Sequence, residues 1–213
     1  SMDFQFEADI VRSLGRIIDK GHLHKGSKPV HWCTDCGSAL AEAEVEYENH
    51  TSPSIYVKFQ LDEESASKLL PKGLNLHSAY LVIWTTTPWT LMGNVAVALH
   101  PEAQYAVWKG KAGEAWITLE ELPEAARQFL GVSKDKPQLV QKLRGEALAE
   151  LDLQYLHPLG LGKGKGVLAD YVSTEEGTGL VHTAPGFGAE DFATGRRYGL
   201  EVVAPVDMRG RFE

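Results

Sequence analysis

Apolar residues recur along the chain at two spacings, and each spacing predicts a different kind of element. Phe6, Ile10, Leu14 and Ile17 follow a helical period, which predicts an amphipathic helix from Asp3 to Lys20. Elsewhere the apolar residues alternate with polar ones or form short continuous runs, and both patterns predict strands. These predicted strands are Ala39–Glu48, Ile55–Leu61, Ala79–Trp84, Asn94–Leu99, Tyr105–Lys109, Glu114–Thr118, Leu139–Leu143, Leu151–Leu156, Val167–Val172, Gly179–Ala184 and Glu201–Val206.

Capping residues predict three more helices. Asp62 precedes a short helix, and the capping box Thr118–Glu121 opens a helix that runs to about Leu130. A third helix covers Gly188–Tyr198 and ends at Gly199. The alternation in Ala39–Glu48 is the most regular of all and predicts a half-buried strand whose glutamates face solvent.

The order of these elements predicts the fold class. Strand pairs lie close together with short turns between them, unlike the strand–helix alternation of a doubly wound sheet. We therefore expect an α+β fold with an antiparallel-rich, barrel-like sheet and flanking helices. Residues 1–48 should form an N-terminal helix and a stem segment, and residues 49–213 the core of the domain.

Composition and charge narrow the class of protein. The chain has 213 residues, 43% of them hydrophobic and 23% charged, which is ordinary for a globular protein. Its net charge of −8 disfavours bulk electrostatic binding of nucleic acid but allows a protein that receives only the end of a strand. No apolar run reaches the roughly 18 residues of a membrane span. Two cysteines are too few for a secreted disulfide framework, so we expect a cytoplasmic location.

Two motifs suggest ligands only weakly. Cys33-x-x-Cys36 supplies two of the four ligands of a zinc site, and the nearby His22, His24 and His31 could add to them. The alternatives are a reduced pair on a turn, or half of a site completed beyond residue 213. No metal site is therefore predicted within the chain alone. The Gly/Lys run Leu159–Gly166 matches neither phosphate-loop template and predicts a basic hairpin, whose Lys163 and Lys165 could still contact a phosphate backbone.

The segment Trp84–Thr90 is the first that suggests a pocket. A buried strand runs directly into three successive threonines, a proline and a second tryptophan. Hydroxyls can orient a polar substrate and a water, while indoles form an apolar wall.

The segment Gly177–Asp191 is the second. Its glycines permit close approach of the backbone to a ligand. His182 lies in a predicted strand, where it is either a core residue or a pocket residue. Asp191 lies near a helix start and serves either as a cap or as the partner of a ligand ammonium. No G-x-S-x-G elbow accompanies these segments.

Four segments resemble the editing domain of class I aminoacyl-tRNA synthetases, the connective-polypeptide insertion of the isoleucyl, valyl and leucyl enzymes. Trp84–Asn94 is similar to the isoleucyl form, because the other two carry Arg after two Thr. Lys28–Cys33, Ser38–Tyr47 and Gly177–Asp191 also resemble bacterial isoleucyl sequences. The ATP-dependent synthetic site of the family needs His-Ile-Gly-His and Lys-Met-Ser-Lys-Ser motifs, and neither occurs here. The resemblance therefore implies an excised editing fragment of such a synthetase.

The activity implied by the resemblance is hydrolysis of the ester of mischarged valyl-tRNA(Ile) to valine and free tRNA. Its implied partners are the tRNA(Ile) 3′ end carrying a noncognate amino acid and the remainder of the synthetase, with no membrane and a monomeric chain. No cofactor is implied for editing, and zinc belongs to the incomplete stem site of Cys33 and Cys36. The implied catalytic residues are Thr86, Thr87, Asn94, His182 and Asp191. The implied substrate-binding residues are Trp84, Thr85, Trp89, Thr90, Gly179, His182, Gly186, Phe187 and Asp191.

Within that set, the resemblance gives Asp191 the α-ammonium and gives His182 the side-chain pocket. Thr86, Thr87 and Asn94 would orient the ester, the terminal ribose or the attacking water. Two alternatives remain open at this stage. One is a tRNA-binding module without turnover, and the other is a structural stem organised by zinc.

Overall fold

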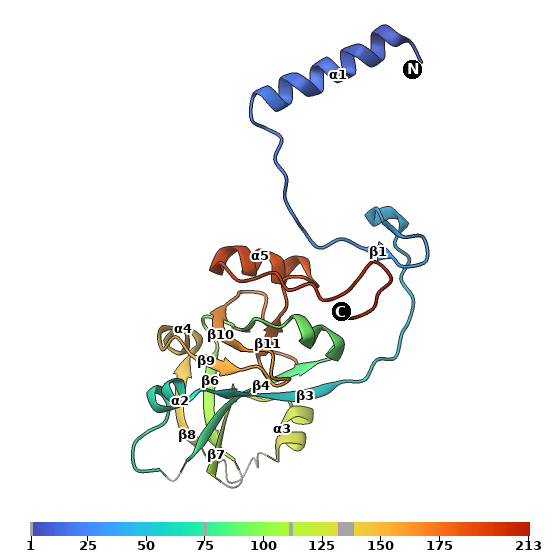
Figure 1. Ribbon diagram of the computed structural model, residues 1–213. Helices are drawn as coiled ribbons and strands as arrows, with labels where there is room; N and C mark the ends of the chain where they lie inside the picture. The colour runs from blue at the N-terminus through green and yellow to red at the C-terminus, as the bar shows by residue number, and fades with distance from the viewer. Residues whose placement is uncertain (1, 75, 111–112, 132–138) are drawn as a thin grey trace.

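The computed structural model describes residues 2–74, 76–110, 113–131 and 139–213, and most of these residues surround one large sheet (Figure 1). The sheet has nine strands in the order β11-β5-β10-β9-β3-β4-β7-β6-β8. Their bounds are β3 (Ile55–Leu61), β4 (Ser78–Thr85), β5 (Ala96–Leu99), β6 (Gln104–Lys109), β7 (Glu114–Leu119), β8 (Leu139–Arg144), β9 (Gln154–Leu156), β10 (Lys163–Leu168) and β11 (Leu180–Thr183).

The pairing confirms the predicted α+β class. Two neighbouring pairs, β5 with β10 and β4 with β7, are parallel, and the other six are antiparallel. The sheet curls strongly enough for its edge strand β11 to contact β4. Among the described residues β11 and β8, at its two ends, are not paired with each other, so the barrel does not close.

The inside of the curl holds the main hydrophobic core. Phe59, Leu81, Ile83, Tyr105 and Tyr155 are among its largest fully buried side chains. Burying one side chain of this size contributes about 1.5–3 kcal/mol, so this cluster fixes the strands that carry the site. Short helices flank the sheet, namely α2 (Glu63–Leu69), α3 (Glu124–Leu130), α4 (Gly145–Glu150) and α5 (Ala189–Tyr198).

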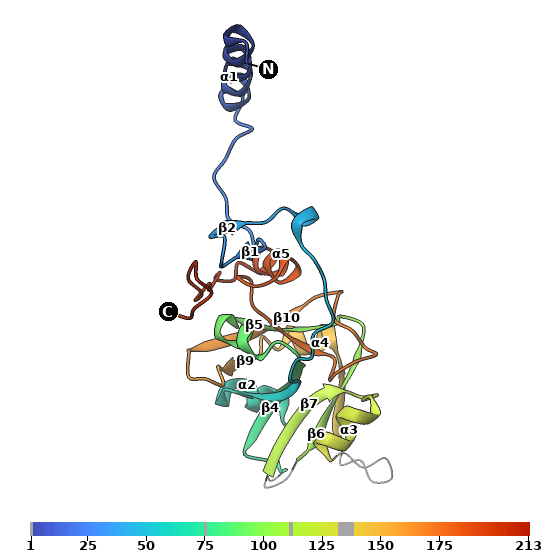
Figure 2. The same cartoon turned by 90° about the vertical axis from the view of Figure 1, so that its right-hand side faces the viewer.

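The first helix, α1 (Phe4–Asp19), confirms the prediction from its apolar spacing. The Asp3 carboxylate accepts a hydrogen bond from the Phe6 N–H at 2.9 Å and caps it. Both views place α1 far from the sheet, at the end of an extended segment (Figures 1 and 2). Its apolar face is therefore exposed, with Ile10 and Leu14 each about half accessible to solvent.

A small hairpin lies between α1 and the sheet. It consists of β1 (Trp32–Cys33) and β2 (Ser38–Ala39), and the 3-10 helix η1 (Glu42–Glu44) follows it. Strand pairing stops at Ala39, so the predicted strand Ala39–Glu48 is wrong. Residues 40–48 are largely exposed and pair with no strand among the described residues. The Glu44 carboxylate instead accepts a hydrogen bond from the Ala41 N–H at 2.7 Å.

Two further predictions are wrong. Thr118–Glu121 does not open a helix, because Thr118 belongs to β7 and its hydroxyl accepts a hydrogen bond from the Trp108 indole at 2.8 Å. The helix α3 begins only after Pro123. Glu201–Val206 is not a strand, since it contributes a single bridge from Val206 to Phe212. At Thr118, pairing within the sheet and the contact with Trp108 outweighed the local pattern.

Candidate functional site

The threonine-rich segment forms a tight turn at the end of β4. The 3-10 helix η2 (Pro88–Gly93) follows, and its proline occupies the first turn, where a fixed φ is favourable. The buried Thr85 hydroxyl accepts a hydrogen bond from the Thr87 N–H at 3.1 Å. The Thr90 hydroxyl donates to the Thr87 carbonyl at 2.7 Å, and the hydroxyls of Thr87 and Thr90 are 3.4 Å apart. These bonds place three hydroxyls in one connected row.

His182 joins this row from β11, at the other end of the sequence. Its Nε2 lies 2.9 Å from the Thr90 hydroxyl oxygen. The Thr90 proton is already donated to Thr87, so Thr90 accepts from His182 and the ring carries its proton on Nε2. Burial lowers the pKa of His182 to about 4, with His157 nearby acting in the same direction, so the ring is neutral at pH 7. Its Nδ1 is buried without a hydrogen-bond partner among the described residues.

Asp191 lies in the first turn of α5, close to the end of β11. Its Oδ2 accepts a hydrogen bond from the Ala184 N–H at 2.8 Å. Burial raises the pKa of this carboxyl and Glu190 adds to the effect, while the Ala184 N–H and the Tyr171 hydroxyl act against it. The N-terminus of α5 stabilises the Asp191 carboxylate. Partial burial leaves the attraction between this carboxylate and a cationic ligand group less screened than in water.

Two predicted catalytic residues differ in their surroundings. Asn94 is buried, and both ends of its amide are engaged: Nδ2 donates to the Ala96 carbonyl at 2.9 Å, and Oδ1 accepts from the Tyr155 hydroxyl at 2.6 Å. Thr86 is exposed, and its carbonyl accepts a hydrogen bond from the Ser52 hydroxyl. The Asn94 side chain therefore fixes the end of η2 through hydrogen bonds, while Thr86 lies at the surface.

The predicted wall residues also occupy distinct places. Trp84 is half-buried against Gly177, where an added Cβ would lie 3.1 Å from the indole. Gly179 has φ +73° and is packed so tightly that a Cβ would lie 2.1 Å from Leu119 Cγ. Trp89, on η2, is 47% exposed. Two of these residues thus make close contacts, while Trp89 presents its indole to solvent.

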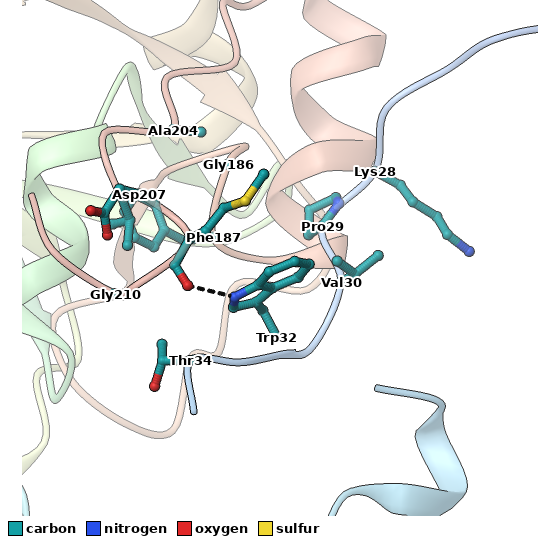
Figure 3. A pocket seen from close by; sticks show the side chains of 12 residues that line it. Lys28, Pro29, Val30, Trp32, Thr34, Gly186, Phe187, Ala204, Asp207 and Gly210 are labelled. Carbon is teal, nitrogen blue, oxygen red and sulfur yellow. Dashed lines mark hydrogen bonds between the residues drawn. The ribbon is translucent and has the colours of Figure 1, made fainter. Parts of the chain in front are cut away.

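Gly186 and Phe187 line a separate cavity of about 470 Å³ between the stem hairpin and the C-terminal segment (Figure 3). The Trp32 indole crosses it and donates to the Met208 carbonyl at 2.8 Å. The Phe187 ring also contacts η2, because a Cβ on Gly93 would lie 2.5 Å from it. Phe187 therefore lies between this cavity and the end of η2.

The cysteine and lysine motifs have limited roles in this structure. The Cys36 N–H donates to Cys33 Sγ at 3.2 Å, which lowers the pKa of the Cys33 thiol. No group of three or more potential metal ligands occurs in the described part of the chain, so these two thiols do not fit a four-ligand zinc site by themselves. Lys163 forms an ion pair with Asp62 at 2.9 Å, in the predicted hairpin of β9 and β10. Over the residues described, no helix is both long and apolar enough to cross a membrane.

Sequence reasoning missed three residues next to the site: Tyr155, His157 and Tyr171. The first two contact the end of η2, and the hydroxyl of Tyr171 lies near Asp191. The only available signal was the apolar–polar alternation that places 155 and 157 on one face of a strand.

Comparison with known proteins gives concordant results. The profile of the tRNA synthetases class I (I, L, M and V) matches residues 1–158. The isoleucine–tRNA ligase of Halorhodospira halophila is 49% identical over 216 residues, which are 100% of this chain and 22% of that protein. The enzyme of Shewanella oneidensis is 47% identical over 100% of this chain and 23% of its own length. The chain thus spans about a fifth of the length of the curated relatives it matches.

Solved structures agree in fold. The editing domain of the Plasmodium knowlesi cytosolic leucyl-tRNA synthetase superposes with a TM-score of 0.57 and 15% identity, over 68% of this chain and 62% of that one. The corresponding domain of P. falciparum gives a TM-score of 0.52 and 11% identity, over 76% and 74%. At these identities the likeness shows a shared fold.

Proposed function

The chain belongs to the class I tRNA synthetases of the isoleucine, leucine, methionine and valine group. We propose that it carries out an editing reaction, which removes a wrongly attached amino acid from tRNA(Ile). Its reaction is hydrolysis of the ester that joins valine to the terminal ribose, which releases valine and free tRNA. The observation that carries this proposal is the hydrogen bond of 2.9 Å between Thr90 and His182, which joins the two segments singled out in the sequence.

Hydrolysis of an aminoacyl ester requires few catalytic groups from the protein. An aminoacyl ester is already activated, so a positioned water and stabilisation of the developing oxyanion suffice without a protein nucleophile. The hydroxyls of Thr87 and Thr90 would orient that water or the ester, with the exposed Thr86 beside them. Asp191 would bind the α-ammonium of the amino acid. Asn94 would act through the turn, because its side chain is fully engaged.

Selectivity would come from the size of the pocket. One methylene is worth about 1–3 kcal/mol in an apolar pocket, a range for which the isoleucyl synthetase is itself the standard example. Synthesis alone cannot exclude valine with so small a difference, so a second pocket that admits only valine is needed. His182 is neutral and rigidly held, which suits a wall that excludes the extra methylene of isoleucine.

The other expectations follow from this role. We propose that the partners are the tRNA 3′ end and the remainder of a cytoplasmic synthetase, that the chain is monomeric, and that hydrolysis uses no cofactor. Residues 1–48 would be the stem and residues 49–213 the editing core. Zinc would enter only if ligands from outside this chain joined Cys33 and Cys36.

The test is deacylation of valyl-tRNA(Ile) and isoleucyl-tRNA(Ile), side by side, at low salt. We expect selective loss of valine, and loss of that activity in Asp191→Ala with the fold retained. Glu190→Ala is the matched control, since it removes the neighbouring exposed carboxylate of the same helix turn. Salt-sensitive tRNA binding without any hydrolysis would support a binding module instead.

A further inference from the structure

Tyr155 in β9 and His157, directly after it, extend their side chains to the second half of η2 and its C-terminal cap. The Tyr155 hydroxyl donates to Asn94 Oδ1 at 2.6 Å, and His157 Nε2 lies 2.9 Å from the Leu91 carbonyl oxygen. Residues 155 and 157 are two apart, so they lie on one face of the extended chain. Both are buried, with exposed fractions of 0% and 6%. They therefore hold η2 at two points, Leu91, which directly follows Thr90, and the C-terminal cap Asn94.

The direction of each hydrogen bond is fixed. The Leu159 N–H donates to His157 Nδ1 at 3.1 Å, so the ring proton must be on Nε2, where it is donated to Leu91. Burial lowers the pKa of His157, which keeps the ring neutral and this arrangement intact. The Asn94 amide is oriented in the same way, because its Nδ2 donates to Ala96 and leaves Oδ1 for Tyr155.

The hairpin of β9 and β10 is shaped to permit these contacts. Gly164 is directly opposite Tyr155 in the strand register. A Cβ at this position would lie 2.2 Å from the Tyr155 hydroxyl, so any side chain there would displace the ring. The Phe59 ring packs edge-on against both Tyr155 and His157. One glycine of the Gly/Lys motif is thereby explained by close packing rather than by phosphate binding.

A 3-10 helix of six residues has poor internal hydrogen-bond geometry and depends on its surroundings. The threonine hydroxyls hold the start of η2, and the side chains of Tyr155 and His157 hold its second half and its cap. We propose that Tyr155 and His157 are positioning residues for editing, which fix the register of η2 so that the Thr90 hydroxyl meets His182. This inference rests on the proposed function for its kinetic consequence, but its structural part does not.

The kinetic test uses Tyr155→Phe and His157→Phe, which keep the rings and remove the donors. Misplacing a catalytic group by about 1 Å can cost on the order of 100-fold, so we expect kcat for valyl-tRNA(Ile) deacylation to fall at least about 10-fold. KM should stay within about two-fold, because both side chains are buried and engaged with η2. His157→Gln keeps an N–H donor for Leu91 and should restore most of kcat. Tyr198→Phe is the control, since its hydroxyl bonds only to the Leu168 backbone among the described residues.

A second readout needs no activity. The ring ¹⁵N chemical shifts of His182 report which nitrogen carries the proton and whether it is hydrogen-bonded to Thr90. We expect these shifts to change in Tyr155→Phe and His157→Phe and to stay unchanged in Tyr198→Phe. If the wild-type chain hydrolyses nothing, the proposed function fails while the ¹⁵N shifts still decide the inference. Wild-type kcat together with unaltered His182 shifts in both folded variants would overturn it, as would an equal loss in Tyr198→Phe.

Discussion

The neutral, buried His182 makes a quantitative prediction about acid stability. Its pKa is about 4 in the folded chain and 6.5 when exposed, so between these values the unfolded chain binds a proton that the folded chain does not. The stabilisation is complete above pH 6.5 and is lost as the pH falls toward 4. The pKa difference corresponds to about 3 kcal/mol of unfolding free energy. His182→Gln removes the titrating group and should remove this part of the pH dependence.

The assay is urea unfolding of the wild type and His182→Gln at several values between pH 4 and pH 7. Comparing the two chains isolates His182 from other groups, such as Asp191, whose raised pKa acts in the opposite direction. We expect the wild type to lose about 3 kcal/mol more than the variant over this range. A wild-type-minus-variant difference that stays constant with pH would refute the buried, neutral state of His182. Direct ¹⁵N titration of the ring provides an independent check.

Three further changes should have defined effects. Gly179→Ala forces a Cβ against Leu119 at a positive φ, so urea unfolding should show an unfolding free energy lower by about 2 kcal/mol or more. A much smaller decrease would contradict the tight packing. Tyr105→Phe removes a buried hydroxyl that bridges two backbone groups and should cost about 1–3 kcal/mol in the same assay; an unchanged midpoint would count against that bridge. Cys33→Ser combined with Cys36→Ser should leave the melting temperature unchanged with or without a chelator, whereas stoichiometric zinc in the purified wild type would show that further ligands exist.

Local sequence patterns correctly predicted the elements whose apolar residues are buried in the structure and whose ends carry capping residues. The run from Ala79 to Trp84 became the interior strand β4, and Asp62 and Gly199 became helix caps as expected. The pattern failed in Ala39–Glu48, where the described residues after Ala39 pair with no neighbouring strand. It failed again at Thr118, where a buried tryptophan competed for the hydroxyl that would have capped a helix.

The candidate site was predictable in its parts but not in its assembly. The threonine-rich turn and the segment with His182 are each conspicuous in sequence, yet their contact depends on β11 pairing with β5 and packing on β4. Tyr155 and His157 could not be found by motif. Their role follows from the place of β9 between β10 and β3, which only the sheet order reveals.

The contact between Thr90 and His182 spans 92 residues of sequence, and this separation has a kinetic consequence. The entropy of closing so long a loop must be lost before the contact contributes any stability, so contacts of this kind form late in folding. During synthesis, β4 and η2 leave the ribosome well before β11 and α5. A nascent chain therefore passes through a stage in which the threonine-rich turn has been synthesised but His182, its hydrogen-bond partner, has not.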